Sequence, residues 1–400
     1  MPQSPSREVN GFKTTRKAQP TLLRQLNSRA VFELVRRHGT TSRADLTRSM
    51  GISAPTVAKA LNRLLRAGLL EEIDAPPAPG AGRPAKAYRV AGERMQVLGT
   101  SFDTSRCVVS RGSLNGNIDS ENIQRFPTPR TYRKLIEMVA ERAKEFMSVR
   151  GTTTLGMGIS APGAIDVPNQ IVVSSPNLHL LDGQSPSRDL ATLLGIEVVM
   201  FHDTVAACLA EQQYGMARDL SDFVQIGVHQ GVGVSVVSGG RLLEGRQGMA
   251  GELGHVTVDL NGPRCGCGNR GCLETLATDV AFGRRVCTRL GREIEVDEII
   301  RLAKAGEIDV DAELDETLEY LAVGLGAAIN IFNPAAVLLS SRMLDIHPTV
   351  YDRLKSLTAR HALKTSLEDV QFLLSSRPRG STPIAGIIYH LTNSIGPHLH

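Results

Sequence analysis

One short stretch of the chain concentrates the residue types that bind soft metal ions. His255 is followed by Cys265, Cys267 and Cys272. Three thiolates and one imidazole suit tetrahedral Zn²⁺, and the glycines between the cysteines let the backbone wrap tightly around an ion. Because four protein ligands leave no open position on the metal, the sequence predicts a structural zinc site rather than a catalytic one.

The other cysteines give no sign of a second site. Cys107, Cys208 and Cys287 show no partner pattern, and we expect them to be ordinary reduced residues. The sequence shows no spread disulfide framework, no signal peptide and no apolar run of membrane-spanning length. We therefore expect a cytoplasmic protein with no membrane partner.

Charge is distributed unevenly along the chain. Residues 1–90 contain 16 Lys and Arg against 6 Asp and Glu, whereas residues 91–400 contain 29 against 35. The basic front, residues 1–90, thus has a net charge of +10, and the body, residues 91–400, has a net charge of −6. This asymmetry predicts that the basic front binds a polyanion. A chain of 400 residues is long enough for two or three domains.

Three helices are predicted within the basic front. An apolar stripe predicts a helix over Leu26–His38, and Ser42 is placed to cap a short helix over Arg43–Met50. After a glycine, Ser53 is the expected N-cap of a third helix that runs to about Ala67. A glycine turn between two such helices is typical of a helix-turn-helix.

The third helix has an apolar face and a polar, basic face. The apolar face, expected in the core, comprises Val57, Leu61, Leu64 and Leu65. Residues near the start of such a helix meet base edges, and the later basic residues suit phosphates. The predicted DNA contacts are Ser53, Ala54, Thr56, Lys59, Asn62, Arg63 and Arg66.

A hairpin is predicted after the third helix. Leu69–Ile73 and Ala87–Val90 can pair as strands, although the Pro- and Gly-rich stretch between them also suits a plain linker. Arg83 at its tip resembles short arms that place an arginine in the minor groove. These features predict a winged helix-turn-helix domain over residues 21–90 that binds double-stranded DNA, preceded by a disordered basic tail over residues 1–20.

Residues 91–400 alternate between apolar, strand-like runs and helical stretches, which favours an α/β domain. Strands are predicted at residues 97–102, 107–110, 155–159, 198–201, 223–228, 233–237 and 337–339. Helices are predicted at residues 131–147, 204–214, 274–290, 314–332 and 348–359.

Two segments of this body resemble the signature of the ROK family of repressors, open reading frames and sugar kinases. They are Gly248–His255 (GMAGELGH) and Cys265–Glu274 (CGCGNRGCLE). Weaker matches follow in the family's order at residues 158–163, 175–178, 203 and 324–334. The resemblance runs from about residue 95 to the C-terminus and implies a two-lobed, actin-like and hexokinase-like fold. The family's repressors carry a winged helix-turn-helix in front, which its kinases usually lack.

The resemblance also implies a sugar site between the two lobes. Carboxylates there accept hydrogen bonds from sugar hydroxyls, and His255 can bind zinc through one ring nitrogen and a hydroxyl through the other. His202 stands where the family commonly has asparagine, which affects the choice of sugar. The implied ligand-binding residues are Asn177, His202, Asp203, Glu252, His255 and Glu274.

The nucleotide loops depart from the family's pattern. In the family's kinases the residue at Asp203 is the general base. The first phosphate loop, Asp-x-Gly-Gly-Thr in the family, is Ser101–Ser105 (SFDTS) here, and the second, His229–Gly233 (HQGVG), lacks its threonine. Ser340 and Ser341 replace a glycine pair. Because phosphoryl transfer depends on positioning and charge neutralisation, we expect no enzymatic activity and only a vestigial base at Asp203.

These observations predict a transcriptional regulator, by resemblance a repressor, of sugar uptake or catabolism genes. It is expected to read a DNA operator as a homodimer or homotetramer, because paired helix-turn-helix units read two half-sites. A sugar or sugar-phosphate effector is expected to alter the lobe angle and the spacing of the wings. Three alternatives stay open: an active ATP-dependent sugar kinase with a DNA-binding domain, a regulator controlled by a protein partner, and a module that uses zinc only for folding.

Overall fold

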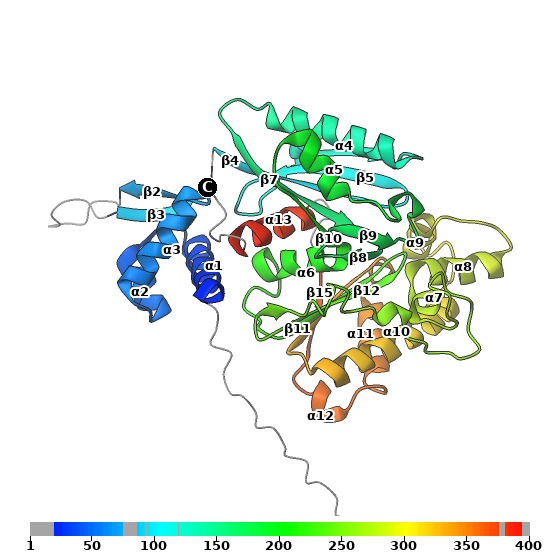
Figure 1. The fold of residues 1–400 in the computed structure, drawn as a ribbon. Coiled ribbons are helices and arrows are strands. Elements are labelled where there is room, and N and C mark those ends of the chain that lie inside the picture. The colour runs from blue at the N-terminus through cyan, green and yellow to red at the C-terminus, as the bar shows by residue number, and fades with distance from the viewer. Residues whose placement is uncertain (1–19, 75–85, 93, 119, 376–380, 394–400) are drawn as a thin grey trace, which may run out of the picture. The chain divides into compact units, whose positions relative to one another are not determined.

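The computed structural model describes residues 20–74, 86–92, 94–118, 120–375 and 381–393 (Figure 1). The chain divides into two compact units. One comprises the residues up to Ala91 together with those from Leu391 onward, and the other comprises Gly92–His390. No helix of the described part of the chain is both long enough and apolar enough to cross a membrane.

The first unit is a three-helix bundle with a small sheet. Its elements are α1 (Pro20–His38), β1 (Thr41–Ser42), α2 (Arg43–Met50), α3 (Ala54–Arg66), β2 (Leu70–Asp74) and β3 (Lys86–Val90). β2 and β3 form an antiparallel hairpin from Leu70 opposite Val90 to Asp74 opposite Lys86. β1 adds to the other edge of β3, so the sheet order is β1-β3-β2. This arrangement is a winged helix-turn-helix.

Helix ends in this unit follow local chemistry. Ser42 caps α2, with its Oγ accepting from the Asp45 N–H at 3.2 Å, and Gly51 ends the helix at φ +62°. Ser53 occupies the N-cap position of α3 but its side chain makes no capping hydrogen bond. α1 begins at Pro20, earlier than the apolar stripe predicts, because proline is favoured in the first helical turn.

The core of the first unit differs from the prediction at one position of α3. Val57, Leu61 and Leu64 are buried as predicted, whereas Leu65 is only half-buried and Ala60 completes the buried face. Position 60 lies between Val57 and Leu64 on the helical surface, so the small Ala60 side chain lies within the apolar stripe. The polar face of α3 is left to solvent.

The body contains two α/β halves. The first half has a five-stranded sheet of order β10-β7-β4-β5-β6. Its strands and helices are β4 (Met95–Ser101), β5 (Arg106–Gly112), β6 (Ile123–Pro127), α4 (Tyr132–Met147), β7 (Thr153–Ala161), β8 (Ala164–Asp166), β9 (Ile171–Ser174), α5 (Pro186–Leu194) and β10 (Val198–His202). Short 3-10 turns cover η1 (Ser120–Asn122) and η2 (His179–Leu181).

The second half has a sheet of order β13-β12-β11-β14-β15. Up to the zinc-type motif its elements are α6 (Asp203–Tyr214), β11 (Phe223–Val228), β12 (Val232–Ser238), β13 (Arg241–Leu242) and η3 (Leu253–His255). After it come α7 (Leu273–Ala277), α8 (Asp279–Leu290), α9 (Val296–Lys304), α10 (Asp311–Phe332), β14 (Ala336–Ser341), η4 (Met343–Asp345), α11 (Pro348–Thr358), α12 (Lys364–Leu367) and β15 (Gln371–Leu374). α13 (Thr382–Asn393) follows.

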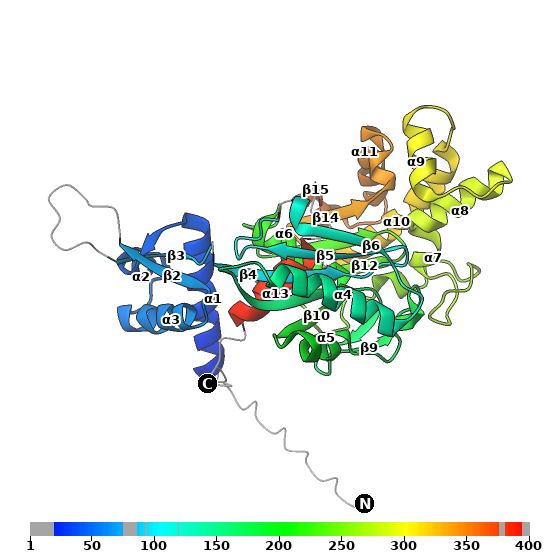
Figure 2. The ribbon, with the colours of Figure 1, turned by 90° about the horizontal axis from the view of Figure 1, so that it is seen from above.

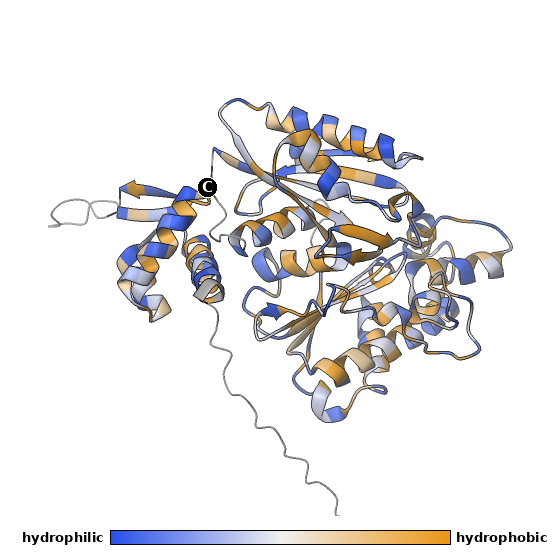
Figure 3. Cartoon of the chain, in the orientation of Figure 1, coloured by the Kyte–Doolittle hydropathy of each residue, from blue (hydrophilic) through white to orange (hydrophobic). Residues whose placement is uncertain are grey.

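Helices cover both faces of each sheet (Figures 1 and 2). α4 and α5 pack on one face of the first sheet, and the helices from α7 to α11 pack on one face of the second. α6 packs on the opposite face of the second sheet, through Cys208 against Phe223. α13 lies so close to β7 that a Cβ added at Gly158 would be 2.0 Å from the Pro383 carbonyl oxygen. Apolar residues accordingly concentrate on the strands and the inner helix faces (Figure 3).

The predicted body strands each coincide with an observed strand to within a few residues, and one predicted helix is wrong. The stretch 274–290 forms two helices, α7 and α8, rather than one. The break lies at Thr278, which is extended (φ −85°, ψ 162°) and accepts the Ala281 N–H on its own Oγ1 at 3.0 Å. Thr278 therefore caps the start of α8 although it lies within a sequence pattern typical of one continuous helix, and the chain changes direction there.

Candidate metal centre and ligand-binding site

The four predicted metal ligands come together in the second half of the body. His255 ends η3, whereas the three cysteines lie on the loop between η3 and α7. One ligand atom from each of His255, Cys265, Cys267 and Cys272 lies within 4.8 Å of the others. Gly271 permits the fold of this loop, since a Cβ there would lie 1.5 Å from the Asp259 carbonyl oxygen.

The spacing of these atoms fits a tetrahedral ion. Cys267 Sγ and Cys272 Sγ are 3.7 Å apart, and His255 Nδ1 lies 3.6 Å from Cys265 Sγ. A tetrahedral zinc ion with Zn–S bonds of about 2.3 Å and a Zn–N bond of about 2.0 Å places two sulfurs roughly 3.8 Å apart, and sulfur and nitrogen roughly 3.5 Å apart. The donor set and its geometry therefore suit a metal ion held by four protein ligands.

The thiols of the centre differ in acidity. Burial raises the pKa of Cys272 to about 12, whereas the Asn269 backbone N–H lowers the pKa of Cys267. A metal ion binds thiolates, so its arrival must displace the proton held by Cys272. Metal affinity at this centre is consequently expected to rise with pH.

The sugar-binding residues expected from the resemblance lie at the ends of elements in both halves of the body. Asn177 follows β9, His202 ends β10, and Asp203 begins α6. Glu252 precedes η3, and Glu274 lies in the first turn of α7. The segment with Glu252 and His255 lies directly on β12, since Cβ atoms added at the glycines on either side of Glu252–Leu253 would be 2.0–2.3 Å from strand carbonyl oxygens.

Glu274 is at the centre of this group. Its Oε2 accepts the Val232 N–H at 3.3 Å. A Cβ added at Gly231 would lie 2.4 Å from that oxygen and 4.0 Å from Asn177 Nδ2, so Glu274 and Asn177 face the same small residue. Burial raises the pKa of the Glu274 carboxyl, and the nearby His255 acts in the opposite direction. The predicted residues Asn177, Glu274 and His255 are thus brought together.

His255 connects the metal centre to this group. Its Nδ1 faces the Cys265 sulfur, whereas its Nε2 lies 3.8 Å from the Glu252 carboxylate. The two ring nitrogens of one imidazole therefore serve different neighbours. A metal ion on Nδ1 fixes the ring and leaves Nε2 toward the polar residues around Glu252.

His202 performs a capping role that an asparagine can also perform. Its Nδ1 accepts the Thr204 N–H at 3.3 Å at the start of α6, and lies 3.2 Å from Asp203 Oδ1. The side chain of Asp203 is 55% exposed, at the positive end of the helix. Gly233 is required opposite this turn, because a Cβ there would lie 2.0 Å from Thr204 Oγ1.

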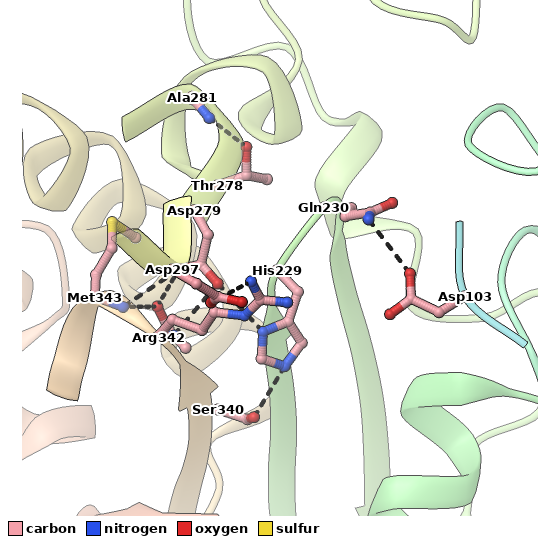
Figure 4. A network of polar contacts seen from close by, with 11 residues as sticks. Asp103, His229, Gln230, Thr278, Asp279, Ala281, Asp297, Ser340, Arg342 and Met343 are labelled. Carbon is pink, nitrogen blue, oxygen red and sulfur yellow. Dashed lines mark hydrogen bonds and ion pairs between the residues drawn. The ribbon is translucent and has the colours of Figure 1, made fainter. Parts of the chain in front are cut away.

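The two loops that hold phosphates in the family's kinases contact each other here. Gln230, in the turn between β11 and β12, donates from Nε2 to Asp103 Oδ1 at 3.3 Å (Figure 4). It also donates from Nε2 to Thr104 Oγ1 at 2.5 Å. Asp103 Oδ1 also accepts the Thr104 N–H at 2.7 Å. Side chains therefore bridge the two turns that the resemblance assigns to phosphate binding.

A buried carboxylate organises the neighbouring strand ends. Asp279 is 2% exposed, and its oxygens accept the Ser341 hydroxyl at 2.8 Å and lie 3.3 Å from His229 Nδ1. His229 Nε2 is 3.0 Å from Ser340 Oγ, and Arg342 pairs with Asp297 at 2.7 Å (Figure 4). Asp279 is not predicted from the sequence, because its partners lie 50 or more residues away and leave no local signal.

The predicted DNA contacts lie along α3 and at its N-cap. Ser53, Ala54, Lys59, Asn62 and Arg66 are exposed, whereas Thr56 and Arg63 are half-buried. The Ser53 hydroxyl is 2.8 Å from the Thr56 hydroxyl, and Arg66 donates to the Asn62 carbonyl at 3.1 Å. Arg83 lies outside the described residues.

Comparison with known proteins gives two family matches and several relatives. Residues 23–83 match the MarR family, and residues 107–390 match the ROK family. The xylose repressor of Bacillus spizizenii is 26% identical over 342 residues, which are 85% of this chain and 88% of that protein. The DNA-binding transcriptional dual regulator NagC of Escherichia coli is 26% identical over 360 residues, covering 86% and 87% of the two chains.

Solved structures share the fold. A ROK family transcriptional regulator, described as a homologue of the E. coli MLC protein, superimposes with a TM-score of 0.81 at 24% identity, over 93% of this chain and 98% of that one. The ROK hexokinase of Thermus thermophilus gives 0.62 at 26% identity, over 74% and 97%. The predicted combination of a winged helix-turn-helix with a sugar-kinase-like α/β fold is therefore confirmed. Since the ROK match covers more than half of the residues, the chain belongs to the ROK family.

Proposed function

We propose that this protein is a DNA-binding transcriptional repressor of sugar uptake or catabolism genes, controlled by a sugar. The observation that carries the proposal is the joining of a winged helix-turn-helix to a ROK body in one chain. Relatives that match it over nearly their whole length are named as a xylose repressor and a transcriptional regulator. The location expected for such a protein is the cytoplasm, with the DNA.

The DNA is read by α3 and the wing. Ala54 and Thr56 near the start of the helix meet base edges, and Lys59 and Arg66 meet phosphates. The exposure of Ala54, Lys59 and Arg66 on one helix supports this assignment. Arg83, from the segment that joins β2 to β3 in the sequence, enters the minor groove. Two copies of the chain, as a dimer or within a tetramer, bind the two half-sites of an operator.

The sugar lies among the polar residues of the body. Its hydroxyls donate to the carboxylates of Asp203, Glu252 and Glu274, and Asn177 and His202 add donors or acceptors. A structural zinc ion held by His255 and the three cysteines fixes the ring that faces this group. The proximity of Glu274, Asn177 and His255 supports a common ligand for them.

The protein acts without phosphoryl transfer. The first loop presents Asp103 where backbone amides would cradle a phosphate, and a carboxylate repels a phosphate at close range. The side-chain amide of Gln230 donates hydrogen bonds to the Asp103 carboxylate and the Thr104 hydroxyl of that loop. Both features also make a free sugar a better effector than a sugar phosphate.

The test is operator binding by purified protein. Fluorescence anisotropy with DNA from upstream of its own gene is measured at several salt concentrations, with D-xylose, N-acetyl-D-glucosamine, D-glucose and their phosphates, and with L-glucose as the control. Specific binding that one D-sugar weakens supports a repressor. No specific binding at low salt overturns the proposal. Specific binding that ignores every sugar points to control by a protein partner.

A sugar kinase is the second candidate, and Asp203 favours it. The residue is retained and half-exposed at the start of α6, where a kinase of this family holds its general base. ATP-dependent phosphorylation of a sugar that is lost in Asp203→Asn would establish the kinase.

A further inference from the structure

The turn between β11 and β12 occupies an unusual position among the groups described above. It comprises His229, Gln230 and Gly231, closed by the His229 N–H donating to the Gly231 carbonyl at 3.0 Å. Each of its residues faces a different neighbour. The turn therefore lies where the sugar-binding residues, the other half of the body and the buried Asp279 come closest to one another.

The first residue anchors the turn to the second half. His229 lies between Asp279 Oδ2 at 3.3 Å and Ser340 Oγ at 3.0 Å. Asp279 is buried and is itself held by Ser341 and the Met343 N–H, at 2.8 and 3.3 Å. This end of the turn consequently moves with the second sheet.

The middle residue reaches the first half. Gln230 donates to Asp103 and Thr104, which lie between β4 and β5 in the other sheet. These are side-chain contacts from the tip of one hairpin to the tip of another, 126–127 residues away in sequence. Figure 4 shows the one between Gln230 and Asp103. Such contacts form or break when the halves rotate, because neither tip is bound to the other through the backbone.

The last residue meets the proposed sugar site. Gly231 faces the Glu274 carboxylate, and the next N–H, from Val232, donates to Glu274 Oε2 at 3.3 Å. A sugar hydroxyl that donates to the same oxygen shares it with Val232 and weakens the long hydrogen bond that Val232 makes. The carboxylate and the turn therefore adjust together when a hydroxyl arrives.

We propose that Gln230 couples occupancy of the sugar site to the relative position of the two halves of the body. This inference rests on the proposed function, because it needs a sugar that binds near Glu274. The hydroxyl that engages Glu274 weakens its bond to the Val232 N–H and the turn shifts about its His229 anchor. The hydrogen bonds from Gln230 to Asp103 and Thr104 then change. The two loops that the resemblance assigns to phosphate binding thereby transmit the change from one half of the body to the other.

The experiment measures coupling rather than binding alone. For each full-length protein, operator affinity is measured by anisotropy with and without saturating D-xylose, N-acetyl-D-glucosamine or D-glucose. Sugar affinity is measured separately by calorimetry. The variants are Gln230→Ala, which removes both hydrogen bonds of the link, Thr104→Val, which removes the one to the Thr104 hydroxyl, and their double variant. Gln124→Ala is the matched control, since Gln124 makes an exposed hydrogen bond to Glu145 within the first half.

In wild type the sugar changes operator affinity, and Gln230→Ala and Thr104→Val each reduce that fold-change by about threefold or more while sugar still binds. The double variant is no worse than Gln230→Ala, because Gln230→Ala already removes the hydrogen bond that Thr104→Val removes. Gln124→Ala behaves as wild type. If the sugar changes operator affinity in both single variants as much as in wild type, the inference is overturned. The proposed repressor function is unaffected by that result. A wild type that binds no operator, or ignores all three sugars, overturns the proposed sugar-controlled repressor and this inference with it.

Discussion

His255 turns its Nδ1 toward Cys265 Sγ, at a separation of 3.6 Å. That orientation leaves Nε2 free to face the polar residues around Glu252. The imidazole therefore contacts both the metal centre and the proposed sugar site. Whether the metal is bound affects both the stability of the body and its affinity for the ligand.

Removal of a metal ligand should lower stability. Cys267→Ser is expected to lose bound zinc, measured by elemental analysis, and to unfold at lower temperature. When free zinc is present at 100 times its Kd, zinc binding adds about 2.7 kcal/mol to the free energy of unfolding. This contribution is lost when the metal no longer binds. Cys287→Ala, a cysteine outside the centre, should keep its zinc. Full zinc occupancy in Cys267→Ser would contradict the four-ligand centre.

Removal of basic side chains should weaken DNA binding in two distinguishable ways. Lys59→Ala is expected to reduce the slope of log affinity against log salt by about 0.9, because one fewer phosphate is neutralised. Arg83→Ala should cost about 1–3 kcal/mol if it makes a good contact in the minor groove. Arg133→Ala on α4 serves as the control. Operator affinity that is unchanged in Arg83→Ala removes the wing from the interface.

Removal of carboxylates should weaken sugar binding. Glu274→Gln and Asp203→Asn are each expected to weaken binding by about 10- to 100-fold, because each loses a charged acceptor of a hydroxyl hydrogen bond. Calorimetry with the sugar that releases the operator measures this. Glu141→Gln, an exposed residue of α4, should bind as wild type. Undiminished binding in both variants would place the sugar elsewhere.

The two serines at the N-cap positions of α2 and α3 should behave differently when changed to alanine. Ser42→Ala removes a capping hydrogen bond from α2 and is expected to cost about 1 kcal/mol, seen as faster hydrogen exchange of the α2 amides. Ser53→Ala removes no such bond, so the change in α3 should stay within about 0.5 kcal/mol, while operator binding weakens. Equal loss of protection in both variants would show that Ser53 also acts as a cap.

Kinase activity should be absent. With ATP, Mg²⁺ and each of the D-sugars above, we expect no phosphorylated product above a blank without protein, because Asp103 and Gln230 stand where phosphates would be held. A coupled assay with an active sugar kinase as positive control measures this. Turnover that Asp203→Asn abolishes would reverse the conclusion.

The sequence by itself determined the features that depend on near neighbours. The metal ligands were predicted because their spacing reflects the geometry of one ion, and the cap at Ser42 was predicted because its partner is three residues away. Apolar runs between helical stretches located the principal strands of both body sheets. A strand that is buried on both faces is apolar along most of its length, and this pattern is visible in its own sequence. The bend at Thr278 was missed, because the periodicity of apolar residues continues across it.

Only the tertiary structure decided how distant residues meet. Asp279 and His229, or Gln230 and Thr104, are far apart in sequence, and no local preference reports that pairing. The proposed coupling turn exists because two hairpin tips from different sheets approach each other, which is a property of packing and not of either hairpin alone.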